Sequence, residues 1–156
     1  MSASFVLDAS VAAKLWLKDE PGCEVAKALV TQAREGRSRL YAPAIFPHEV
    51  CNLLSRAARS LVGGQRTTRL AAAEAKAAAE ELLALPIRIE PFDLAAVRDA
   101  MALSLSFCKP FDDMSYLALA EALDIPWITA DERILLANPP AFPSHRIFTL
   151  AALSRG

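Results

Sequence analysis

The sequence predicts an α/β fold: a central parallel sheet of four to five strands flanked by helices, in a Rossmann-like three-layer α/β/α arrangement. Short apolar runs with strand character alternate with amphipathic helical patterns along the chain. Strands that alternate with helices pair in parallel through helical crossovers. The 156 residues, 54% of them hydrophobic and 22% charged, suffice for one continuous core. We therefore expect a single domain over residues 1–156.

In the first quarter of the chain, individual residues indicate where the helices begin and end. Ser10 is placed to cap the first helix, Pro21 suits the first turn of the second, and Gly36 ends that helix. The strands are expected at residues 4–7 and 39–42, and the helices at 11–18 and 23–35.

The middle of the chain is expected to be helical. A helix over 47–62 should stop at Gly63-Gly64, and an alanine-rich helix over 68–85 is broken by Pro86. The inner stripe of the second helix is expected to consist of Leu70, Ala77 and Leu85.

The second half of the chain returns to the alternating pattern. Ile87 and Ile89 are expected to point inward from a third strand. Asp93 and Asp112 are placed to cap two long helices, and Asp131 opens a short one. The strands are expected at 87–90, 126–129 and 146–150, and the helices at 94–106, 113–123 and 132–137.

Composition narrows the class of protein. With 17 basic and 18 acidic residues the net charge is −1, so nucleic-acid binding would need a local patch of charge. Apolar runs stay short of the roughly 20 residues that span a bilayer, and the N-terminus lacks signal-peptide features. We expect a cytoplasmic protein without membrane contact. The cysteines have no spacing typical of disulfide frameworks or zinc sites and are expected in the core or on helices: Cys23, Cys51 and Cys108.

The first strand ends on an acid where a nucleotide-binding protein would place glycine. A phosphate cradle needs a glycine-rich turn after this strand, because backbone amides must approach the phosphates. The chain has five glycines, none of them before Pro21. The turn presents the carboxylate of Asp8, which attracts cations rather than phosphates.

Further acids occupy equivalent positions. Asp131 follows the fourth strand, Asp113 starts the helix before it, and Glu49 lies in the first turns of the helix after the second strand. If the first and fourth strands are neighbours where strand order reverses, Asp8 and Asp131 lie side by side. The other two acids then approach from flanking helices.

Such a cluster favours a metal. Neighbouring carboxylates raise one another's pKa unless a cation balances them. Mg²⁺ and Mn²⁺ prefer oxygen ligands, and one or two such ions can activate water against a phosphodiester. The sequence thus indicates metal-dependent nuclease cleavage, with the number of ions left open.

Each acid also has a purely structural interpretation. Asp112 and Asp131 make ordinary helix caps, and Glu49 near a helix start favours the helix dipole. Asp8 is different, because Ser10 already serves as the expected cap and an acid ending an apolar strand is costly without a role. The functional interpretation therefore depends on all four acids occurring together at these positions.

At these residues the sequence resembles the PIN-domain family, and more closely the VapC-type toxin ribonucleases of type II toxin–antitoxin systems. The matching stretches are VLDASVAAKLWL, APAIFPHEVCNLL, FDDMSYLALAEALDIPWITADERIL and RIFTL. They occur in the family's order over nearly the whole chain. The D-x-x-Y-L-A-L-A-E run followed by T-x-D is the most specific.

The resemblance implies a PIN-domain fold and a Mg²⁺- or Mn²⁺-dependent endoribonuclease acting as the toxin of a VapBC pair. It also implies an RNA substrate, a small VapB-type antitoxin and a homodimer. The family's catalytic and metal-binding acids carry over onto Asp8, Glu49, Asp113 and Asp131. The doubled acid leaves open whether Asp112 or Asp113 is the ligand, although the spacing to Tyr116 favours Asp113.

Other classes fit less well. A receiver-type phosphoacceptor has an acidic pair near the first strand and a lysine after the last, whereas here Asp8 is single and the stretch 146–156 contains no lysine. A haloacid-dehalogenase phosphotransferase has D-x-D after the first strand, where this chain has D-A-S. The remaining alternative is a catalytically inactive PIN-like module that binds RNA or a partner protein.

Overall fold

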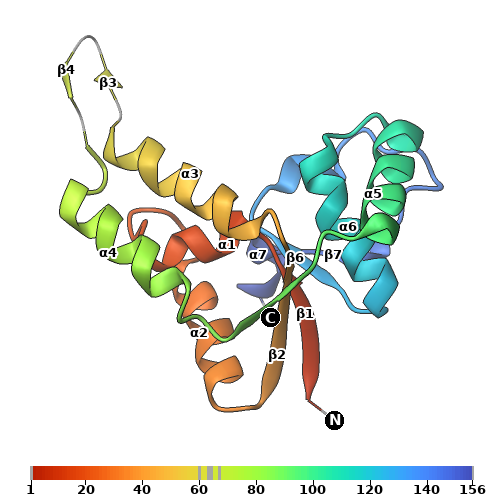
Figure 1. The fold of residues 1–156 in the computed structure, drawn as a ribbon, viewed down its shortest axis with the longest axis horizontal. Helices are drawn as coiled ribbons and strands as arrows, with labels where there is room; N and C mark the ends of the chain where they lie inside the picture. The colour runs from red at the N-terminus through yellow and green to blue at the C-terminus, as the bar shows by residue number, and fades with distance from the viewer. Residues whose placement is uncertain (1, 60, 63–64, 67, 156) are drawn as a thin grey trace.

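The computed structural model describes residues 2–59, 61–62, 65–66 and 68–155. Within these ranges five strands form one parallel sheet in the order β5-β2-β1-β6-β7 (Figure 1). The predicted parallel α/β sheet is therefore confirmed. The strands are β1 Ala3–Leu7, β2 Ser38–Pro43, β5 Ile87–Glu90, β6 Trp127–Thr129 and β7 Ile147–Thr149.

Helices cover both faces of this sheet, as the three-layer prediction requires. In Figure 1 the helices α1 to α4 lie on one side of β1 and β2, and α5 and α6 lie on the other. The α-helices are α1 Ala9–Ala12, α2 Cys23–Arg34, α3 Phe46–Ala58, α4 Ala72–Leu82, α5 Leu94–Phe107, α6 Phe111–Leu123 and α7 Leu150–Leu153. Short 3-10 helices are η1 Ala13–Leu15, η2 Glu132–Leu135 and η3 Ser144–Arg146.

The strand order reverses between β1 and β6. From β1 the chain proceeds outward through β2 to β5, and β6 and β7 are added on the opposite side of β1. Leu7 is in register with Ile128, and the N–H of Asp8 donates to the carbonyl oxygen of Ile128 at 3.0 Å. The carboxyl ends of two central strands thus meet where open α/β sheets bind ligands.

The core lies directly beneath this edge of the sheet. Leu7, Ile128 and Trp127 from β1 and β6 are buried, as is Tyr116 from α6. The rings of Tyr116 and Trp127 stack with their centroids 5.8 Å apart. Close packing on both faces of the central strands fixes their ends and therefore the residues that follow them.

The structure corrects two predictions in the middle of the chain. The helix expected over 47–62 ends at Ala58, and Leu61–Val62 (β3) pairs with Gln65–Arg66 (β4) in an antiparallel hairpin. A partner strand rather than another helical turn thus satisfies these backbone groups. The expected stop at Gly63-Gly64 lies outside the described residues.

The alanine-rich helix α4 starts at Ala72, four residues later than expected, and uses a different inner stripe. Ala78 and Leu82, four residues apart, are buried together with Leu70, whereas the expected Ala77 is exposed. Alanine occurs on buried and exposed helix faces alike, so the sequence did not show which face of this helix points inward. Tertiary packing decides it.

The expected inward direction of Ile89 was wrong. Ile89 is 41% exposed, because β5 is an edge strand whose outer end is incompletely covered. Cys23 and Cys51 lie on helices α2 and α3, as expected, whereas Cys108 follows α5 and is exposed; all three are free thiols. By contrast, Asp93 caps α5 as predicted, with its carboxylate accepting from the Ala96 N–H at 2.9 Å.

Candidate active site

Asp8 follows β1 directly and is held by two hydroxyl groups. Its Oδ2 accepts from Thr129 Oγ1 at 2.8 Å and from Ser10 Oγ. Ser10 Oγ also accepts from the Ala130 N–H at 3.1 Å. These contacts tie the end of β1 to the end of β6, so the packing of two adjacent strands fixes the orientation of Asp8.

Ser10 does not cap the first helix, contrary to the prediction. The carbonyl oxygen of Asp8 accepts from the N–H groups of Val11 and Ala12 at 3.1 and 3.2 Å. The helix therefore starts at Ala9, Asp8 occupies the N-cap position, and Ser10 lies inside the first turn. Its hydroxyl is thereby turned back toward the carboxylate.

Asp8 is only 8% exposed, and burial raises the pKa of its carboxyl. The hydrogen bonds from Ser10 and Thr129 oppose this shift, while the negative charge of Asp131 adds to it. A carboxylate in this position favours any cation that replaces the lost hydration.

Asp131 begins η2 as its N-cap, as predicted, with its Oδ1 accepting from the Arg133 N–H at 3.0 Å. The guanidinium of Arg133 also binds this carboxylate, with Nε 2.8 Å from Oδ1 and Nη2 2.7 Å from Oδ2. These hydrogen bonds lower the pKa of Asp131. Asp131 is therefore ionised and engaged by a cation of its own chain.

Glu49 points into the same region from the first turn of α3. The hydroxyl of Tyr116 donates to its Oε2. Burial raises the pKa of Glu49 to about 7, opposed by the bond from Tyr116 and reinforced by the charges of Asp8, Asp112 and Asp113. Burial also raises the pKa of Tyr116, so its hydroxyl stays protonated as the donor.

The two acids at the start of α6 approach the cluster in different ways. The carbonyl oxygen of Pro110 accepts from the Met114 N–H at 3.1 Å, so the helix begins at Phe111 with Pro110 at the N-cap position. The predicted cap role of Asp112 is therefore wrong, because both acids lie within the first turn.

Asp113 is half-buried, and burial raises its pKa to about 6. The negative charges of Asp8, Asp131 and Asp112 contribute, and Arg133 opposes them. Asp112 is exposed and lines the adjoining cavity, whereas Asp113 is not among the lining residues. Asp112 therefore lines the cavity, whereas Asp113 is coupled to the cluster electrostatically without lining it.

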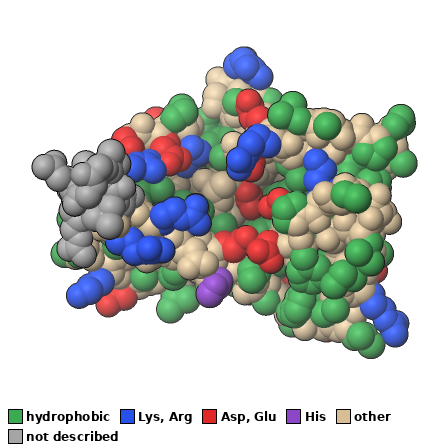
Figure 2. Space-filling model, turned by 90° about the horizontal axis from the view of Figure 1, so that it is seen from above, with side chains coloured by type: hydrophobic (Ala, Val, Ile, Leu, Met, Phe, Trp, Pro, Cys, Tyr) green, Lys and Arg blue, Asp and Glu red, His purple; other side chains and the backbone are tan. Residues whose placement is uncertain are grey.

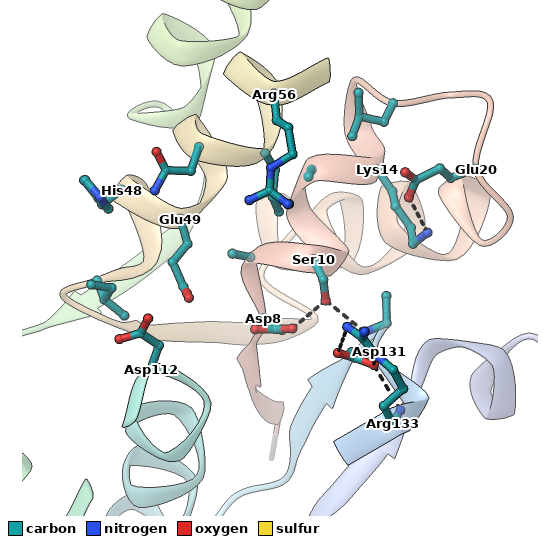
Figure 3. Close-up of a pocket in the computed structure, with 17 residues that line it drawn as sticks. Asp8, Ser10, Lys14, Glu20, His48, Glu49, Arg56, Asp112, Asp131 and Arg133 are labelled. Atoms are coloured by element: carbon teal, nitrogen blue, oxygen red, sulfur yellow. Dashed lines mark hydrogen bonds and ion pairs between the residues drawn. The ribbon is translucent and has the colours of Figure 1, made fainter. Parts of the chain in front are cut away.

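The acids surround an open cavity of about 620 Å³. Figure 2 shows acidic side chains gathered in the hollow of one face, with Lys and Arg side chains around them. In the close-up, Asp8, Glu49, Asp112 and Asp131 lie along the floor of the cavity (Figure 3). The lining also includes polar and basic side chains, namely Ser10, Lys14, Glu20, His48, Asn52, Arg56 and Arg133.

Basic side chains reach this cavity from three elements. Lys14 from η1 is buried, and its Nζ contacts Glu20 Oε2 at 2.9 Å. Arg56 projects into the cavity from α3 (Figure 3). Arg133 approaches from η2. Mixed charge of this kind suits a site that must hold a cation and an anionic backbone together.

The chemistry of the donors fits a hard divalent cation. Four carboxylates and two hydroxyls supply oxygen only, and three of the acids have raised pKa values that a metal would lower. Within the described ranges, however, no three His, Cys, Asp or Glu side chains are arranged as a ready-made metal site. Asp131 is bound by Arg133 and Glu49 by Tyr116.

The structure brings the four sequence-predicted acids near one another: Asp8, Glu49 and Asp131 line the same cavity, and Asp113 is coupled electrostatically to Asp8 and Asp131. The sequence analysis did not identify Arg133. The one available signal was its position two residues after Asp131, an acid expected to begin a helix. It also missed the hydrogen bond that Tyr116, a buried residue of α6, donates to Glu49.

Comparisons with known proteins agree with this arrangement. Three solved structures superpose over most of the chain. The first is VapBC2 from Rickettsia felis bound to a DNA fragment from its promoter (TM-score 0.62, 10% identity, 94% of this chain and 98% of that chain). The second is a toxin–antitoxin complex from Klebsiella pneumoniae (0.61, 14%, 96% and 98%). The third is VapC20 from Mycobacterium tuberculosis, a toxin that cleaves the sarcin–ricin loop (0.60, 17%, 89% and 99%).

At sequence identities of 10–17%, these comparisons show that the fold is similar. A comparison with curated protein sequences gave no match. The sequence profile of the PIN domain, however, matches residues 5–138, a stretch that includes every acid of the site. The chain therefore belongs to the PIN domain family.

Proposed function

We propose that this protein is a Mg²⁺- or Mn²⁺-dependent endoribonuclease that cleaves RNA phosphodiester bonds as the toxin of a VapBC-type toxin–antitoxin pair. The observation that carries the proposal is the cluster itself. Asp8, Glu49, Asp113 and Asp131 come from separate elements; Asp8, Glu49 and Asp131 line one open cavity, and Asp113 is coupled to them electrostatically. Burial and the negative charges of neighbouring acids raise the pKa of Asp8, Glu49 and Asp113. A fold gains no stability from such repulsion, so a functional reason is needed.

The four acids would hold the divalent cation. When bound, the cation supplies charge stabilisation and an activated water for phosphodiester hydrolysis. The chain's own residues prepare the ligands. Ser10 and Thr129 orient Asp8, and Tyr116 orients Glu49. Such neighbours restrict the ligand side chains before any cation arrives.

The walls of the cavity suit an RNA backbone. Lys14, Arg56 and Arg133 place positive charge beside the acids, and phosphate contacts of this kind position a nucleic acid without reading its sequence. The net charge of −1 makes this local grouping the source of any attraction.

The toxin role rests on the structural neighbours, which include toxin–antitoxin complexes and a toxin that cleaves the sarcin–ricin loop. By analogy we propose a small VapB-type antitoxin as a partner, a homodimer as the assembly and the cytoplasm as the location. In the described residues, the helices are too short or too polar to cross a bilayer.

A second candidate is an inactive PIN-like module that binds RNA or a partner protein. It is favoured by the engagement of two of the four carboxylates with Arg133 and Tyr116. The two candidates differ in whether Mn²⁺ or Mg²⁺ binds at neutral pH.

The deciding experiment is incubation of purified, antitoxin-free protein with total cellular RNA in Mg²⁺ or Mn²⁺, with the ends mapped by sequencing. Chelator and Asp8→Asn should abolish discrete cuts. Asp124→Asn is the matched control, because Asp124 is an exposed acid at the end of α6 with a positive φ of 54° that asparagine tolerates. Intact RNA with folded protein that also takes up no Mn²⁺ would favour the inactive module.

A further inference from the structure

The ion pair between Arg133 and Asp131 engages one of the four acids of the cluster, unlike the pair between Lys14 and Glu20 in the same cavity. Both nitrogen donors of the guanidinium edge contact both oxygens of the carboxylate, at 2.8 and 2.7 Å. Both residues lie in the lining of the acidic cavity rather than on a remote surface (Figure 3). A bidentate pair of this geometry uses the carboxylate oxygens that a metal would need.

Arg133 also faces a second acid of the site. Its positive charge lowers the pKa of Asp113, against the raising effects of burial, Asp8 and Asp131. Its side chain is 84% exposed, so it is restrained mainly by Asp131. Arg133 thus holds a positive charge beside two acids of the cluster, Asp113 and Asp131.

We propose that Arg133 is a positioning residue that acts as an internal counter-cation: it holds Asp131 in the metal-free protein and must leave this carboxylate when a divalent cation binds. The inference rests on the proposed function, because it assumes that the acids bind a metal. It adds that metal affinity is set partly by a competitor within the chain.

The competition is expected to be modest and reversible. Exposed ion pairs gain little free energy, because water screens them and an ordered side chain loses entropy. Arg133 is therefore strong enough to keep Asp131 ionised in place without preventing metal uptake. Lys14 differs, because it is buried beside Glu20 and binds neither oxygen of Asp131.

The test measures Mn²⁺ affinity by electron paramagnetic resonance in metal-free protein without RNA. Arg133→Gln should bind Mn²⁺ about two- to fivefold more tightly than wild type, since the competing pair is lost. The matched control is Arg146→Gln, which breaks an ion pair between Arg146 and Asp124 outside the cavity lining. Its Mn²⁺ affinity should equal that of wild type. Circular dichroism checks that each variant is folded.

A second readout separates direct displacement from a general effect of charge. In a ¹⁵N-edited spectrum, Mg²⁺ should shift the Nε–H signal of Arg133, assigned as the signal that Arg133→Gln lacks. A signal that stays unchanged while Mg²⁺ binds would overturn the proposal, as would equal Mn²⁺ affinity in Arg133→Gln and wild type. If neither protein binds Mn²⁺, the metal site and the inference both fail. Normal binding without a change in Arg133→Gln defeats the inference alone.

Discussion

The strand side and the helix side of the acidic cavity are built differently. On the strand side, Asp8 is buried and held by Ser10 and Thr129, at the junction of the two central strands. On the helix side, Glu49 and Asp113 lie in first turns and are half-exposed. The strand side is therefore held at the junction of two central strands, whereas the helix side is more exposed and Glu49 there is oriented by the hydroxyl of Tyr116.

This contrast has a physical cause. A residue that follows a buried central strand has a well-defined backbone position, because the close-packed core fixes the end of that strand. Glu49 and Asp113, in the first turns of their helices, are less enclosed, so a single contact such as that from Tyr116 to Glu49 has more influence on orientation. The two sides should therefore respond differently to substitution, and the following predictions test this from the largest effect to the smallest.

The largest effect is expected for Asp8→Asn. Asparagine can still accept hydrogen bonds from Thr129 and Ser10, so the fold should persist while the charge for the metal is lost. We expect RNA cleavage to fall about 100-fold or more. The measurement is the initial cleavage rate beside Asp124→Asn, with thermal melting as the check on folding. Activity close to wild type would remove Asp8 from the site.

Tyr116→Phe should have the next largest effect. Phenylalanine keeps the stacking on Trp127 but removes the only described donor to Glu49 Oε2. We expect a loss of about tenfold in cleavage rate and of about 1 kcal/mol in the free energy of unfolding. Denaturant titration and cleavage assays measure the two quantities. An unchanged rate would mean that Glu49 needs no help from Tyr116.

Asp113→Asn should stabilise the metal-free protein. The folded-state pKa of Asp113, about 6, lies above its ordinary value of 3.8. Ionisation therefore opposes folding, and this penalty grows as pH rises from about 4 to above 6 and vanishes in acid. At pH 8 we expect a gain of about 1 kcal/mol, or roughly 2–4 °C in Tm.

Calorimetry of the Asp113→Asn variant with chelator at pH 8 and pH 4 tests this sign. The difference from wild type should shrink at the lower pH, and Asp124→Asn should show no such trend. A variant less stable than wild type at pH 8 would contradict the repulsion that we infer among the acids.

The smallest effect is expected for His48→Ala. His48 is exposed and lines the cavity. Its removal should change the free energy of unfolding by less than about 0.5 kcal/mol. Cleavage should stay within about twofold of wild type in the same assay. A loss comparable to that of Asp8→Asn would place His48 among the reacting groups.

Local patterns predicted the parts of the site that depend on local physics. Asp131 and Asp93 cap their helices as expected, because a cap is a contact within three residues. The patterns failed where the phase of a helix was at issue. Ser10 and Asp112 were expected to cap helices that in fact start two residues earlier, at Ala9 and Phe111.

The sequence by itself determined the alternating α/β order and the acid that ends the first strand, because hydrophobic periodicity and turn chemistry are local. Only the tertiary structure decided which side chains orient these acids. Thr129 meets Asp8 across 121 positions of the chain, and Tyr116 meets Glu49 across 67. Such pairs form when the core packs, because strand order and helix phase bring distant residues within hydrogen-bonding distance.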